Sequence, residues 1–270
     1  MAETDLIFLL GRHRSGTTVF RDLLERCGGL NCHEIMSAKL DAQRGFYGYV
    51  ARRVAEDPKW VWPIRHQRLF ADYIAELRQE AAGRRLLLDL KYWGLNLIPV
   101  SEDVAGARPF LVEFIDARDA PVIQILRRNK LRLIVSEALL NASGKWFAVA
   151  GERGAGGPEE KPKITLDPGG LLAEVERLIA MDAAIRAMLA PLRNAHELIY
   201  EEMFAPSGEF APQTRALAAE VMGVAEAAVP LSPAHRKMNP EPLDEILANF
   251  DAVEAALAGS PHHWMLRAAP

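Results

Sequence analysis

Several features that would mark particular classes of protein are scarce in this sequence. Only two of its 270 residues are cysteine, Cys27 and Cys32, which are too few for a disulfide framework, and we expect both to be free thiols. No group of His, Cys, Asp and Glu residues has the spacing of metal ligands, so no metal ion is implied. The formal net charge is −4, which offers no bulk attraction to nucleic acid.

Long hydrophobic runs are missing as well. No stretch approaches the roughly 20 apolar residues of a membrane-spanning helix. The short apolar run at residues 6–10 follows no basic segment, so it does not resemble a signal peptide. Hydrophobic residues make up 50% and charged residues 25% of the chain, as in a globular domain that buries a core. We therefore expect a soluble protein in the reducing cytoplasm.

Short apolar runs alternate with longer segments of helical periodicity. This alternation predicts an α/β, P-loop-type three-layer fold, in which helices flank a central parallel sheet. No internal repeat or change of composition divides the chain, so we expect residues 1–270 to form a single domain. The predicted strands are Leu6–Leu10, Leu30–Ile35, Leu86–Leu90, Val122–Leu126 and Leu198–Tyr200. The predicted helices are Thr17–Cys27, Gln67–Glu80, Lys130–Leu140, Leu171–Met188, Thr214–Met222 and Leu243–Leu257.

One segment, at about 141–162, differs in composition from the rest of the chain. It is rich in glycine and proline, which is typical of a surface loop or lid over a site. Shortly after it, Asp167 and Pro168 form a good helix start, because aspartate caps a helix and proline suits its first position. We expect substrate specificity to lie in this segment and in the regions at about 37–85 and 141–195.

A glycine-rich loop lies between the first predicted strand and the first predicted helix. Gly11 and Gly16 have the Gly-x4-Gly spacing of a P-loop, in which backbone N–H groups at a helix start bind phosphate. Thr17 stands where a nucleotide triphosphatase carries lysine, so ordinary ATP hydrolysis is not expected. The residues expected to bind an anion here are Arg12, His13, Arg14, Ser15, Gly16, Thr17 and Thr18.

A second basic element follows the predicted strand Val122–Leu126. Arg128 comes shortly after this strand, and Ser136 lies eight residues further on, about two turns along a helix. An arginine at a strand end and a serine on the next helix can jointly hold one phosphate group. Taken alone, this pattern is weak, because basic residues on a helix usually face solvent.

The two elements together resemble the sulfotransferases that use 3′-phosphoadenosine 5′-phosphosulfate (PAPS). In that family a Lys/Arg-Ser-Gly-Thr-Thr loop binds the 5′-phosphosulfate, and here Arg14 begins that motif. The family's second motif, an arginine and a serine eight residues apart, binds the 3′-phosphate and matches Arg128 and Ser136. Arginine in place of the loop lysine is usual in carbohydrate-type and bacterial members.

Weaker similarities extend the resemblance along the chain. Lys91 ends a strand as the lysine of the family's central strand does, and Tyr200 begins a Tyr-Glu-Glu sequence similar to the family's Tyr-Glu-Asp. Arg236 and Lys237 resemble a late basic pair that closes over the nucleotide. The regions at about 37–85 and 141–195 match no part of the family.

The resemblance implies a reaction and its participants. PAPS would donate a sulfuryl group to a hydroxyl of a carbohydrate or small metabolite, and adenosine 3′,5′-bisphosphate (PAP) would be released. Arg14 would stabilise charge that develops on the leaving 5′-phosphate, and Lys91 would contact the acceptor or the bridging oxygen. The identity of the acceptor is left open, and the C-terminal helix is a candidate surface for a homodimer.

Transfer to a hydroxyl group calls for a general base. Glu34 is the first candidate, since it lies in the predicted second strand, which arrives beside the loop, and His33 is its rival because imidazole titrates near neutral pH. Adjacent residues of a strand point to opposite faces, so only one of the two should face the site.

Two other functions fit parts of the same pattern. A small-molecule kinase would also use a P-loop, but it would carry the loop lysine and an aspartate at a strand end for Mg²⁺. A non-catalytic protein with a degenerate P-loop would bind a nucleotide without turnover, and would not need Glu34.

Overall fold

The computed structural model describes residues 5–100, 108–143, 163–234 and 241–267. The chain forms a five-stranded, all-parallel sheet in the order β2-β3-β1-β4-β5, so the predicted α/β class is confirmed. The strands are β1 (Leu6–Gly11), β2 (Leu30–Glu34), β3 (Leu86–Lys91), β4 (Val122–Leu126) and β5 (Ala195–Ile199). Every residue of β1, β3 and β4 is buried, as expected for central strands covered on both faces.

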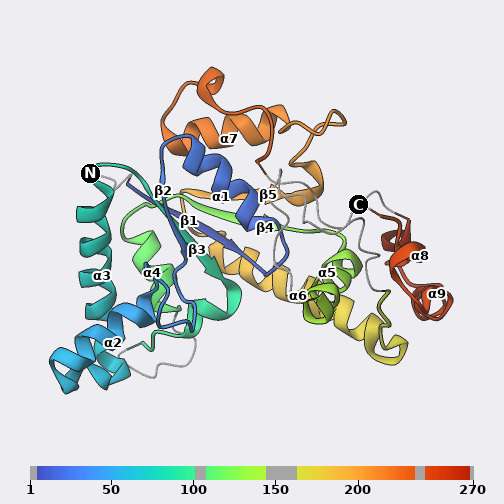
Figure 1. Ribbon diagram of the computed structural model, residues 1–270, viewed down its shortest axis with the longest axis horizontal. Helices are drawn as coiled ribbons and strands as arrows, with labels where there is room; N and C mark the ends of the chain where they lie inside the picture. Colours follow the sequence, from blue (N-terminus) through green and yellow to red (C-terminus); the bar gives the residue numbers. More distant parts are fainter. Residues whose placement is uncertain (1–4, 101–107, 144–162, 235–240, 268–270) are drawn as a thin grey trace, which may run out of the picture.

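Helices cover both faces of the sheet and form the outer layers (Figure 1). α1 and α7 lie on one face, where they bury apolar residues against the sheet. α2, α3, α4 and the end of α6 contribute to the apolar cluster on the other face. The longer helices are α1 (Thr17–Arg26), α2 (Phe46–Glu56), α3 (His66–Ala81), α4 (Phe110–Asp116), α5 (Lys130–Ser143), α6 (Pro168–Leu189) and α7 (Pro212–Met222).

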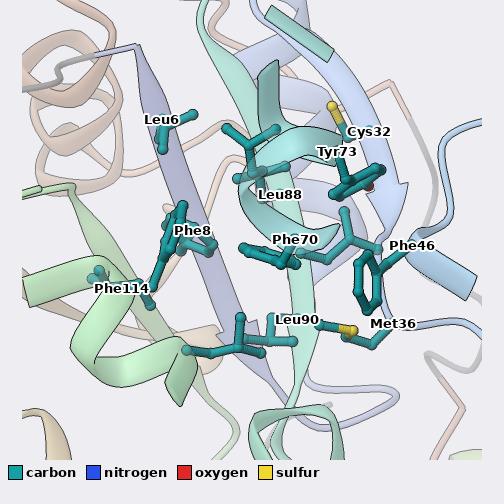
Figure 2. Close-up of a cluster of buried hydrophobic side chains, with 14 of the residues drawn as sticks. Leu6, Phe8, Cys32, Met36, Phe46, Phe70, Tyr73, Leu88, Leu90 and Phe114 are labelled. Carbon is teal, nitrogen blue, oxygen red and sulfur yellow. The ribbon is translucent and has the colours of Figure 1, made fainter. Parts of the chain in front are cut away.

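Phe70 of α3 is central to the larger cluster (Figure 2). Its ring lies 5.3 Å from that of Phe46 and 5.0 Å from that of Phe114, both in edge-to-face geometry. Such pairs add to the free energy gained by burying the rings themselves. This cluster therefore ties α2 and α4 to the sheet through α3.

The structure differs from the predicted helices at three places. α2 and α4 are helices where the sequence pattern predicts none. The expected single helix over 243–257 is two short helices, α8 (Leu243–Ile246) and α9 (Phe250–Leu257). The break occurs because the backbone between them pairs with Ile164: Ile164 N–H donates to the carbonyl of Ile246 and Ala248 N–H to that of Ile164.

Other expectations agree with the structure. Asp167 accepts a hydrogen bond from Gly169 N–H at 3.0 Å and so caps α6, whose first residue is Pro168. Cys27 and Cys32 are free thiols. None of the described helices is long and apolar enough to span a membrane. Most of the glycine- and proline-rich loop, 144–162, lies outside the described residues.

Candidate functional site

The candidate site lies at the carboxyl ends of β1 and β4. β1 pairs with β3 on one side and β4 on the other, so the order of strands reverses at the β1–β4 pair. In open parallel sheets, ligands bind outside the carboxyl ends of the strands at such a reversal. The glycine-rich loop follows β1, and the second basic element follows β4, so the topology brings the two predicted motifs to the same place.

The backbone of the loop after β1 is tightly folded. Arg14 and Gly16 both have positive φ, 65° and 100°, and the N–H and hydroxyl of Ser15 both donate to the carbonyl of Arg12. Gly16 directly precedes α1, whose first N–H groups have no partner within the helix. This arrangement of amides and helix start is suited to binding an anion.

The side chains of Arg14 and Ser136 are in direct contact. Arg14 Nε donates to Ser136 Oγ at 2.9 Å, although the two residues are 122 positions apart in the sequence. Ser136 lies in α5 and is buried. The structure therefore joins one residue from each of the two sequence motifs.

Arg127, which was not predicted as a site residue, lies beside Arg14. Its Nη1 donates to the backbone carbonyl of Arg14 at 3.3 Å, and its guanidinium carbon lies 4.8 Å from the centre of the Tyr200 ring. Burial and then the charge of Arg127 lower the pKa of Arg14. The sequence signal that could have identified Arg127 as a site residue is its position directly after the last residue of β4.

Arg128, the predicted 3′-phosphate ligand, points elsewhere in this structure. Its exposed side chain forms an ion pair with Glu202. The backbone N–H groups of Arg128 and Asn129, just before α5, donate to Glu201, both at 2.9 Å. Asn129 Oδ1 accepts from Arg132 N–H at 2.9 Å and so caps the start of α5. Reaching a nucleotide would require Arg128 to give up an exposed ion pair, which is worth little.

Tyr200 closes one side of the loop. It begins the short 3₁₀ helix η4 (Tyr200–Glu202) directly after β5, and burial raises its pKa. A Cβ atom placed on Gly16 would overlap the Tyr200 ring. The ring is thus packed against the loop backbone, and glycine at position 16 is required by both the contact and the positive φ.

Lys91 reaches the loop from the end of β3. Its Nζ donates to Thr17 Oγ1 and to Asp89 Oδ1, each at 2.7 Å, and it is buried. Asp89 is 1% exposed and also accepts from Arg21 of α1 at 2.9 Å. This network places an ammonium group at the threonine that occupies the usual position of the P-loop lysine.

Glu34 and His33 lie in different surroundings. A Glu34 carboxylate oxygen lies 4.0 Å from Nδ1 of His13 in the loop. His33 has a positive φ of 57° at an irregularity in β2, and its pKa is lowered by burial and by the charge of Arg21. The bulge breaks the strict alternation expected for a strand. Of the two candidates, Glu34 is the one in contact with the loop.

The remaining predicted residues are dispersed. Arg12 Nη1 lies 2.9 Å from Met181 Sδ of α6, away from the Arg14–Ser136 pair, and Thr18 is half-buried in the first turn of α1. Arg236 and Lys237 lie outside the described residues.

No metal centre is found in the part of the chain that the structure describes, where no three His, Cys, Asp or Glu side chains come together as ligands would. No protein-family model matches this sequence, and no curated protein is significantly similar to it. The assignment of function therefore depends on the residues and geometry of the site.

Proposed function

We propose that this protein is a PAPS-dependent sulfotransferase that acts on a hydroxyl group of a carbohydrate or small metabolite. The observation that carries the proposal is the 2.9 Å hydrogen bond between Arg14 and Ser136. Each belongs to a motif with a phosphate-binding role in the family that the sequence resembles, and the two motifs were identified separately. Their meeting at the sheet's reversal point is what a ligand with two phosphate groups would need.

The roles of the side chains follow from their positions. The loop amides and Arg14 would hold the 5′-phosphosulfate, and Ser136 the 3′-phosphate. As the acceptor oxygen bonds to sulfur, the bond from sulfur to the bridging phosphate oxygen breaks, and PAP leaves. Glu34 would take the proton of the acceptor hydroxyl, and Lys91 would stabilise charge on the bridging oxygen.

One observation favours a kinase as the second candidate. Lys91 Nζ donates to Thr17, which occupies the position of the P-loop lysine, so the ammonium group is restored from a neighbouring strand. Against a kinase, Asp89 near this strand end is buried, and its two carboxylate oxygens already form ion pairs with Lys91 and Arg21. The two candidates differ in the nucleotide that they bind.

Calorimetric titration tests the proposal, using PAP in one series and ATP with Mg²⁺ in the other. We expect PAP to bind, and Ser136→Ala to weaken its binding about tenfold, because the variant loses a hydrogen bond to a charged group. Ser232→Ala is the matched control, since Ser232 is exposed and its carbonyl contacts Arg26 at the opposite end of α1 from the loop. Binding of ATP with Mg²⁺ but not of PAP would overturn the proposal in favour of the kinase.

A further inference from the structure

We infer that Arg127 is a phosphate-binding residue of this site, which together with Arg14 forms a two-arginine clamp for an anion. The inference rests on the proposed function for the identity of the nucleotide, but not for the presence of the anion. Neither the P-loop spacing nor the Arg128–Ser136 motif assigns a role to Arg127.

The first argument comes from the partners of the buried guanidinium. Arg127 is 8% exposed, and its Nε is buried without a hydrogen-bond partner. Among the described residues it forms no ion pair, and its contacts are the carbonyl of Arg14 and the face of the Tyr200 ring. The nearby carboxylate of Glu201 is occupied by the backbone N–H groups of residues 128 and 129.

The second argument is energetic. A buried charge without a counter-ion is costly, and two arginines side by side repel each other. Burial lowers the pKa of Arg127, Arg14 and Arg132, and the charge of Arg127 lowers the pKa of the latter two further. Tyr200 and Glu201 oppose the effect of burial on the pKa of Arg127. A phosphate dianion placed between Arg14 and Arg127 would relieve the repulsion and supply charge-assisted hydrogen bonds.

The third argument is geometric. Tyr200 packs against Gly16 of the loop and under the Arg127 guanidinium, so the ring fixes the arginine relative to the anion-binding backbone. A planar guanidinium held by stacking presents its remaining N–H groups in a defined direction. Arg127 is therefore oriented by the same residue that shapes the loop.

The test compares binding and stability in Arg127→Gln and Arg127→Lys, with Arg26→Gln as the control. Arg26 is an arginine at the far end of α1, bonded to the Ser232 carbonyl. We expect Arg127→Gln to weaken PAP binding about 10- to 150-fold, the loss of one charge-assisted contact, and Arg127→Lys to weaken it less because the charge is kept. Without ligand, the melting temperature of Arg127→Gln should equal or exceed that of the wild type, because an unpaired buried charge is removed.

A structural role for Arg127 would give the opposite pattern: a lower melting temperature, with the PAP affinity of the folded protein within twofold of wild type. That result, or unchanged affinity in both variants, overturns the inference while leaving the sulfotransferase proposal standing. Pyrophosphate serves as a second probe. If it binds in an Arg127-dependent way while PAP does not bind, the inference holds and the proposed function fails; if the wild type binds neither, both fail.

Discussion

Glu34 and His33 are neighbours in the sequence, yet their side chains lie in different surroundings. The positive φ of His33 belongs to the irregularity in β2, after which Glu34 lies near His13 of the loop. The pKa of His33 is instead lowered by burial and by the charge of Arg21 of α1, and is raised by the charge of Glu25 of the same helix. A single backbone conformation therefore gives two adjacent candidate bases different surroundings.

The base assignment predicts a specific kinetic effect. Glu34→Gln should lower kcat for sulfuryl transfer by roughly 10²- to 10⁴-fold, because the acceptor hydroxyl loses the group that takes its proton. PAP affinity should change little, since Glu34 is not expected to contact phosphate. Transfer of radiolabelled sulfate and titration with PAP measure the two quantities, with Glu56→Gln, at an exposed residue that ends α2, as the control. Loss of activity in His33→Gln and its retention in Glu34→Gln would move the role to His33.

At the scale of elements, the junction between β1 and α1 combines two constraints at Gly16. Its φ of 100° is unfavourable for a residue with a Cβ atom, and the Tyr200 ring leaves no room for one. Gly28, just after α1, has the same φ of 100°, but no atom lies within 4 Å of the position that a Cβ would take there. Backbone strain therefore applies at both glycines, whereas steric overlap applies only at Gly16 of the two.

Comparing substitutions at these two glycines measures the effect of overlap with the Tyr200 ring. Gly28→Ala should cost about 1–2 kcal/mol of unfolding free energy from backbone strain alone. Gly16→Ala should cost more and should also abolish PAP binding, because the ring and the loop must separate. Chemical denaturation and calorimetry provide the two readouts. Equal destabilisation in the two variants, with PAP affinity retained, would show that the Tyr200 contact is unimportant.

The strands and α1 were predictable because their signals are local. Apolar runs of five or six residues bounded by turns mark β1, β3 and β4, and the Gly-x4-Gly spacing marks the start of α1. α2 and α4 have no such marker: α2 begins after a glycine, and neither has a capping side chain. The break between α8 and α9 depends on pairing with Ile164, which is about 80 residues away and has no local signal.

At the scale of the whole molecule, two apolar clusters lie on the two faces of the sheet, whereas the candidate site lies at the carboxyl ends of its strands. Figure 2 shows Phe70 between Phe46 and Phe114, within the layer that α3 packs on the sheet. None of these three residues contacts the loop side chains described above. Stability and ligand binding should therefore respond to different substitutions.

Phe70→Ala tests this separation. It should lower the unfolding free energy by about 3–5 kcal/mol, because a fully buried ring leaves a cavity. PAP affinity of the folded protein should stay within about twofold of wild type. Trp62→Ala is the control, an aromatic truncation at a residue that is 62% exposed, and should change stability by less than about 0.5 kcal/mol. A parallel loss of affinity in Phe70→Ala would show that the core and the site are coupled.

By itself, the sequence determined the alternation of strands and helices, the glycine-rich loop after the first strand, and the presence of a second basic motif, since each depends on residues that are close along the chain. Only the tertiary structure decided that Arg14 meets Ser136, that Arg127 rather than Arg128 lies beside the loop, and that Lys91 reaches Thr17. These contacts join segments that are far apart in the sequence. They depend on the order in which the strands pack in the sheet. Arg127 and Arg128 are the same residue type at adjacent positions, so the sequence does not distinguish them. The direction in which the backbone leaves β4 buries Arg127 and exposes Arg128.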